Sequence, residues 1–290
     1  MRTMVVLIPR HRSYEPDQLP GSDRDLLAAG MPTWEYRKPS TEDRSEGVPL
    51  FPEPTLVLLL LAAVVLVGAI VQGSIGFGLG MVSSPAIVWF YPELMPGAMI
   101  MLGGLNAVAV LAADWKSVDW RGVGWAFLGR LPGLFLGTWL VVMASPTVLS
   151  LLVGVAVVVA AALQWSQWQI RKTRSTLAVA GFISGTSGTV SGIGGPPVAM
   201  VYASEPGPQV RATLSVYFIA ATATSLLGLG MVGRVDLQQL GLTLTLVPAL
   251  VLGTLVARPL ARILDAGYTR RATLIVAAVA GVLLIVSSAA

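Results

Sequence analysis

The most informative stretch of the sequence is residues 181–197, GFISGTSGTVSGIGGPP, which lies between strongly apolar runs. Its glycines and paired prolines interrupt a helix, and interrupted helix at membrane depth is tolerated only where protein surrounds it or a water-filled cavity lies beside it. A helix that resumes after a break offers unpaired N–H groups and the positive end of its dipole to a small anion. The stretch therefore predicts an anion site in the membrane; the alternative is close helix packing through small residues.

A second glycine-rich break lies upstream, at residues 73–80. The two breaks supply the candidate substrate-binding residues: glycines and a proline that allow close approach, and hydroxyl or amide side chains that donate hydrogen bonds. They are Gln72, Gly73, Ser74, Gly76 and Gly78 in the first break, and Thr186, Ser187, Ser191, Gly192, Gly194, Gly195 and Pro196 in the second. For any single hydroxyl, the competing interpretation is a hydrogen bond to its own helix backbone.

Arg130 is a further candidate substrate-binding residue, inside the apolar run of residues 122–143. An ionisable residue near mid-membrane is a functional-site candidate by default. We expect its guanidinium to act as the counter-charge of the anion, and the alternatives are snorkelling or pairing with a carbonyl or with Asp119. No carboxylate falls inside a predicted span, so the sequence shows no acidic proton relay and leaves energy coupling open.

The composition excludes several classes of function. Of 290 residues, 54% are hydrophobic and 12% charged, and the mean hydropathy is +0.75, so the chain is an integral membrane protein. The net charge of +4 comes from basic residues in a tail and in short loops, which is typical of membrane orientation rather than of nucleic-acid binding.

The residues needed for catalysis are also missing. Ser187 lies in a G-T-S-G sequence, but the single histidine, His11, is in the polar tail, so an intramembrane serine protease would lack its base. There is no cysteine, no phosphate-binding loop and no metal-ligand motif. We therefore expect no enzyme, no catalytic residue, no metal site and no cofactor.

Apolar runs long enough to cross a membrane follow one another from Pro54 onward. These runs predict an all-α, polytopic transmembrane protein of about eight spans, near residues 55–73, 96–113, 122–143, 147–164, 175–190, 211–231, 239–257 and 272–289. The first and fifth runs continue through the glycine-rich breaks. Each is therefore a broken or a re-entrant segment.

The two breaks belong to an internal repeat with an offset of about 116 residues, from Gly76 to Gly192. At the same offset, the P-x-x-x-L-G-T pattern of residues 132–138 recurs at 248–254. The sequence thus predicts two repeats of about four spans, at residues 53–165 and 176–290. A polar, disordered tail precedes them at 1–52, and a basic linker joins them at 166–175.

Membrane orientation stays open at this point. The basic linker and the basic residues that precede the last span would face opposite sides if residues 176–202 crossed the membrane fully. They would face the same side if that segment dipped in and returned. The basic residues in question are Arg258, Arg262, Arg270 and Arg271.

On these motifs the chain resembles the sulfite exporter TauE/SafE family, also called the sulfonate uptake and export permeases. Residues 181–197 match its G-x-x-x-G-x-x-G-x-G-G-G-type stretch with a following proline, and residues 68–85 match it more loosely. The first copy carries Leu79 and Met81 where small residues are usual, which leaves open whether both halves bind substrate. The resemblance covers about residues 55–290.

The resemblance implies a secondary transporter, or permease, in the bacterial inner membrane. It also implies a small anionic substrate, such as sulfite, sulfoacetate or another organosulfonate. The expected partners are that anion and the lipid bilayer, and the oligomeric state stays open. A passive anion channel and a non-transporting membrane assembly protein are the alternatives, and neither the transport direction nor the coupling ion is indicated.

Overall fold

The computed structural model describes residues 56–166, 170–263 and 266–289, and the regular elements in these ranges are all helical. These residues lie within one compact unit, Pro49–Ala290. The all-α prediction is therefore confirmed for the described part of the chain. The tail predicted over residues 1–52 falls outside the described residues.

Each predicted apolar run coincides with a long helix. The helices are α2 (Leu56–Ile75), α3 (Leu79–Phe90), α4 (Gly97–Asp114), α5 (Trp120–Met143), α6 (Pro146–Trp165), α7 (Arg174–Ser191), α8 (Gly195–Val201), α9 (Gly207–Met231), α10 (Leu237–Ile263) and α11 (Ala266–Ala289), with short 3-10 helices at Pro92–Leu94 and Trp115–Ser117. Among the described residues, 6 helices are long and apolar enough to cross a membrane: α2, α4 with the following 3-10 turn, α5, α6, α9 and the Leu237–Ala257 part of α10.

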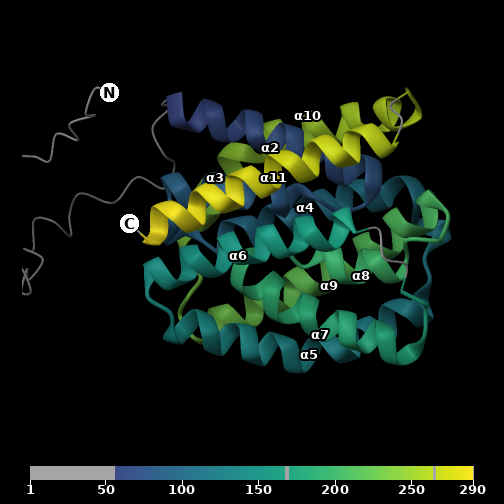
Figure 1. Ribbon diagram of the computed structural model, residues 1–290, viewed down its shortest axis with the longest axis horizontal. Coiled ribbons are helices and arrows are strands. Elements are labelled where there is room, and N and C mark those ends of the chain that lie inside the picture. The colour runs from purple at the N-terminus through teal and green to yellow at the C-terminus, as the bar shows by residue number, and fades with distance from the viewer. Residues whose placement is uncertain (1–55, 167–169, 264–265, 290) are drawn as a thin grey trace, which may run out of the picture. The chain divides into compact units, whose positions relative to one another are not determined.

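Two pairs of helices run side by side in the same direction, α5 with α7 and α2 with α10 (Figure 1). Glycines allow this close approach. In the first pair, a Cβ added at Gly129 or Gly133 would collide with the backbone of α7. In the second pair, Gly73 lies against Ala257, and a Cβ added at Gly253 would collide with the carbonyl oxygen of Leu66.

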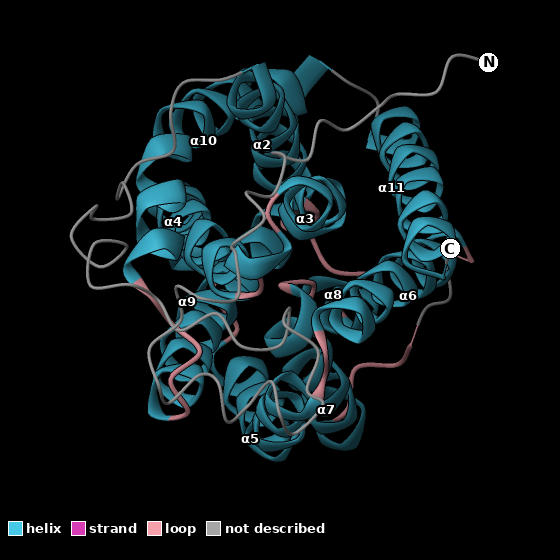
Figure 2. Cartoon of the chain, turned by 90° about the vertical axis from the view of Figure 1, so that its left-hand side faces the viewer, coloured by secondary structure: helices cyan, strands magenta, loops and turns pink. Residues whose placement is uncertain are grey.

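Two further pairs run in opposite directions. In α4 and α9, Thr222 Oγ1 donates to the carbonyl oxygen of Ile100 at 3.2 Å, and Arg211 pairs with Asp114 at 2.8 Å. In α6 and α11, Gly154 and Gly281 lie against each other's helix. In the end-on view of Figure 2, α3 and α8 lie in the middle, surrounded by these longer helices.

Both glycine-rich breaks are turns between a long helix and a short one. Gly76 and Gly78, between α2 and α3, have φ of 93° and 124°, and Gly192, after α7, has φ of 72°. Only glycine adopts such values without strain. After each turn the short helix packs back on the long one: Gly68 of α2 lies against Leu79 of α3, and Ser184 of α7 donates to the carbonyl oxygen of Gly194 at 2.5 Å. We call α2–α3 and α7–α8 the first and second hairpins.

Candidate functional site

The two hairpins touch at their glycines. A Cβ added at Gly80 would lie 2.6 Å from the carbonyl oxygen of Gly192, and one added at Gly195 would lie 2.8 Å from Cβ of Phe77. Ser84 of the first hairpin also donates to the carbonyl oxygen of Ser191 in the second, at 2.8 Å. The absence of side chains at these glycines brings the two backbones together.

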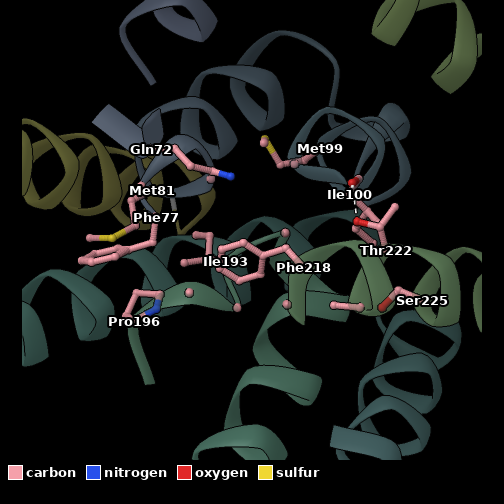
Figure 3. Close-up of a pocket in the computed structure, with 18 of the residues that line it drawn as sticks. Gln72, Phe77, Met81, Met99, Ile100, Ile193, Pro196, Phe218, Thr222 and Ser225 are labelled. Atoms are coloured by element: carbon pink, nitrogen blue, oxygen red, sulfur yellow. Dashed lines mark hydrogen bonds between the residues drawn. The ribbon is translucent and has the colours of Figure 1, made fainter. Parts of the chain in front are cut away.

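A cavity lies where the hairpins meet (Figure 3). The space open to the centres of water-sized molecules is about 60 Å³, whereas a single water needs about 10–15 Å³, so a small oxyanion fits. Both hairpins and helices α4, α5 and α9 contribute to the wall. The lining residues are Gln72, Phe77, Gly78, Gly80, Met81, Met99, Ile100, Gly103, Arg130, Gly188, Gly192, Ile193, Gly194, Gly195, Pro196, Phe218, Ala221, Thr222 and Ser225.

Arg130 brings a positive charge to this cavity from the middle of α5. Its side chain is 2% exposed. Its Nη1 donates to the carbonyl oxygen of Ser184 at 3.3 Å, and its Nη2 donates to the carbonyl oxygen of Ala221 at 3.2 Å and to Oγ of Ser225 at 2.6 Å. The guanidinium also lies 5.8 Å from the ring centre of Tyr217. These acceptors orient Arg130 without neutralising it.

No carboxylate of the described residues pairs with Arg130. Its Nε is buried and has no hydrogen-bond partner within the described part of the chain. Of the alternatives that the sequence left open, pairing with backbone carbonyls is present, while snorkelling and pairing with Asp119 are not. A buried positive charge that is held only by neutral groups is strongly stabilised when an anion binds beside it.

Gln72 contributes a neutral polar side chain to the wall. Its side chain is 5% exposed, and the amide extends from α2 into the cavity (Figure 3). Among the described residues, no hydrogen-bond partner is found for this amide. Gln72 can therefore donate to a bound oxyanion, or accept from a bound hydroxyl.

The predicted hydroxyls lie elsewhere. Ser74, Thr186, Ser187 and Ser191 do not line the cavity, and their hydroxyls donate to backbone carbonyls. The acceptors are Ile70 for Ser74 (2.8 Å), Gly133 and Phe182 for Thr186 (both 3.2 Å), Ile183 and Ile193 for Ser187 (both 2.9 Å) and Ser187 for Ser191 (2.7 Å). Backbone bonding, the competing interpretation, applies to all of them. They stabilise the hairpins.

The predicted glycines divide into two groups. Gly78, Gly192, Gly194 and Gly195 line the cavity together with Pro196. Gly73 instead packs against Ala257 of α10, and Gly76 packs against Arg211 of α9. Helix packing therefore explains Gly73, while Gly76 is required both by this packing and by its positive φ in the turn.

Sequence reasoning missed the cavity walls contributed by α4 and α9. Phe218, Thr222 and Ser225 recur at the i, i+4, i+7 spacing of one helix face, and Met99 and Gly103 at i, i+4. This periodicity marks a face of each helix. It does not say which face meets the glycine-rich breaks.

A cluster of charged residues lies at the ends of the second hairpin. Lys172, before α7, pairs with Glu205, after α8, at 2.5 Å and with Asp119, before α5, at 3.5 Å. Tyr202 Oη donates to Asp119 at 3.0 Å. Burial alone would raise the pKa of the Asp119 carboxyl, but hydrogen bonds from the Gly122 amide and Tyr202, together with Lys172, lower that pKa below 3.8. The cluster holds both ends of the second hairpin beside α5.

Comparison with known proteins places the chain in a family. No curated protein and no solved structure shows a significant match. The sequence profile of the family described as Sulfite exporter TauE/SafE matches residues 60–284, which include the second hairpin, the first hairpin from residue 60 onward and every residue of the cavity wall. The chain is a multi-pass cell-membrane protein and belongs to the sulfite exporter TauE/SafE family.

Proposed function

We propose that this protein is a secondary transporter of small anions, with sulfite or an organosulfonate as its substrate. Membership of a permease family supports transport, and one observation supports an anionic substrate. Arg130 is buried in the wall of a cavity and pairs with no carboxylate among the described residues. An anion bound there replaces the missing counter-charge.

Besides Arg130, the proposed site has two further sources of hydrogen-bond donors. Gln72 supplies a side-chain amide. The first amides of α3, at Leu79, Gly80 and Met81, precede the first intrahelical bond, which Val82 donates to Gly78 at 3.1 Å. They place the positive end of the α3 dipole beside a bound anion. α8 adds less, because Pro196 and Pro197 have no N–H.

We further propose that both hairpins are re-entrant. In the second hairpin, the Lys172–Glu205 pair joins the residues that precede α7 to those that follow α8. A segment whose two ends meet at one face enters and leaves the membrane on the same side. In the first hairpin α2 is long enough to cross, yet α3 turns back along it, with Gly68 against Ser83.

With re-entrant hairpins, each half of the chain crosses the membrane an odd number of times: α4 to α6 in the first half, and α9 to α11 in the second. An odd number inverts the second half relative to the first, as in many secondary transporters. The offset of about 116 residues places α2 on α7, α3 on α8, α4 on α9 and α5 on α10. In this mapping α5 corresponds to α10 and α7 corresponds to α2. The packed pair α5–α7 therefore has a counterpart in the packed pair α10–α2, which supports two repeats.

Flux into proteoliposomes tests the proposed function. We expect saturable uptake of sulfite or methanesulfonate that responds to an imposed ion gradient. Linear flux that follows voltage would instead indicate a passive channel. No flux with any sulfur oxyanion would contradict transport and leave a membrane assembly role.

Cysteine labelling tests the re-entrant arrangement, because the natural chain has no cysteine. Single cysteines at Arg171, before the second hairpin, and at Ser204, after it, are expected on the same side of the membrane, whereas a segment that crossed fully would put them on opposite sides. An impermeant maleimide should therefore label both from one side of oriented vesicles. Labelling from opposite sides would contradict re-entry of the second hairpin.

A further inference from the structure

We propose that the site selects a monoanion with an apolar substituent, such as a short alkanesulfonate, over dianions of similar size. This inference rests on the proposed function and makes it more specific. It follows from the charge of the cavity wall, from the chemistry of the remaining wall and from the position of Gln72.

The charge of the wall sets the preferred charge of the ligand. Among the described residues that line the cavity, Arg130 alone carries a charge, and neither an acidic residue nor a lysine or histidine lines it. A monoanion makes the occupied cavity neutral. A dianion leaves one uncompensated negative charge in a site of low polarity, and such a charge is costly to bury.

The rest of the wall is suited to an apolar group. It presents the side chains of Phe77, Met81, Met99, Ile100, Ile193 and Phe218. Figure 3 shows Gln72 and Met99 on one side of the cavity, with Ile193 and Phe218 on the other. These side chains cannot hydrogen-bond to a fourth oxygen, whereas contact with a methyl or methylene group is favourable.

The hydroxyls of the wall do not change this conclusion. Ser225 Oγ accepts from Arg130 at 2.6 Å and lies 3.0 Å from Thr189 Oγ1. Thr222 Oγ1 donates to the carbonyl oxygen of Ile100 at 3.2 Å. The Gln72 amide is the one polar side chain of the described wall that makes no hydrogen bond within the described part of the protein. Gln72 is neutral, so it adds a hydrogen bond without a second positive charge.

Methanesulfonate and sulfate test the proposal directly, since they have almost the same size and differ in charge and in one methyl group. Each would compete, at neutral pH, against labelled methanesulfonate flux into proteoliposomes holding the full chain. We expect sulfate to compete at least about tenfold more weakly than unlabelled methanesulfonate, a difference of about 1.4 kcal/mol. Ethanesulfonate and ethane-1,2-disulfonate repeat the comparison with a longer apolar part.

The outcomes separate this inference from the proposed function. Equal or stronger competition by the dianions would overturn charge selection while leaving anion transport in place. Flux of sulfate without flux of methanesulfonate would do the same. Absence of all anion flux would contradict both.

Substitutions at Gln72 test its part in the selection. Gln72→Lys adds a second positive charge to the wall, so we expect competition by sulfate, relative to methanesulfonate, to rise at least about tenfold. Gln72→Met keeps the size and the charge of the wall, so the preference for the monoanion should persist although affinity falls. An unchanged preference in a folded Gln72→Lys protein would overturn the role of Gln72. The wild-type comparison does not depend on either variant folding.

Discussion

Nη2 of Arg130 lies 2.6 Å from Oγ of Ser225, which in turn lies 3.0 Å from Oγ1 of Thr189. These two contacts join α5, α9 and α7 at the cavity wall. It fixes the direction of the guanidinium with neutral groups, so the positive charge stays available to a ligand. The same group therefore links three helices and, in the proposed function, attracts the anion.

Arg130→Gln should abolish measurable anion transport. It removes the only charge among the described residues of the wall, and a hydrogen bond to a charged group contributes about 1.5–3 kcal/mol. The measurement is flux into proteoliposomes, with membrane abundance determined in parallel. Arg171→Gln, a change at an exposed position of the linker, is the matched control and should transport normally. Normal flux in a folded Arg130→Gln protein would refute the anion site.

Ser225→Ala should weaken transport without abolishing it. The substitution removes one acceptor of Arg130 but leaves the carbonyl oxygens of Ser184 and Ala221, at 3.3 and 3.2 Å. The guanidinium keeps its charge and loses part of its orientation. We expect the KM of the transported anion to rise several-fold, because less of the arginine is held in the binding geometry. Ser150→Ala, on α6, removes a solvent-exposed hydroxyl and is the control; equal KM values in the two variants would contradict the orienting role.

Gly80→Ala should destabilise the protein, because the hairpins are in backbone contact at this residue. The new Cβ would lie 2.6 Å from the carbonyl oxygen of Gly192, and overpacking of this kind costs about 1–3 kcal/mol. Gly124→Ala is the matched control, since no atom lies within 4 Å of its added Cβ, and it should be neutral or slightly stabilising. Thermal unfolding in detergent measures the difference. Equal midpoints for the two variants would mean that the hairpins do not meet at Gly80.

Much of the fold could be predicted from the sequence, because hydrocarbon imposes long apolar helices and glycine marks their interruptions. That the Arg130 side chain lies inside the protein among polar groups was predictable for a similar reason, since a charge inside an apolar run needs a function or a partner. Which hydroxyls line the cavity was not predictable, because serine and threonine in a helix bond to the backbone as readily as to a ligand. Phe218 and Met99 were not predictable either. Their contact with the breaks depends on how α4 and α9 pack, and no local pattern encodes that packing.

Acid should loosen the charged cluster at the second hairpin. The pKa of Asp119 is lowered from 3.8 in the folded protein, so its contribution to stability is present above that pH and is lost as the pH falls through the folded pKa. The pKa of Lys172 is raised from 10.5, first by its hydrogen bond to Glu205, so its contribution is present below that pH and is lost as the pH rises through the folded value. Between the two limits both groups are charged.

The measurement is the thermal unfolding midpoint of purified wild-type protein and of Asp119→Asn. Between about pH 6 and about pH 3, we expect the wild-type midpoint to fall more steeply, because the variant has no Asp119 carboxylate to protonate. At about pH 6 the variant should already be the less stable protein, since asparagine accepts from Gly122 without attracting Lys172. Parallel pH profiles for the two proteins would show that the Asp119 carboxylate does not stabilise the second hairpin.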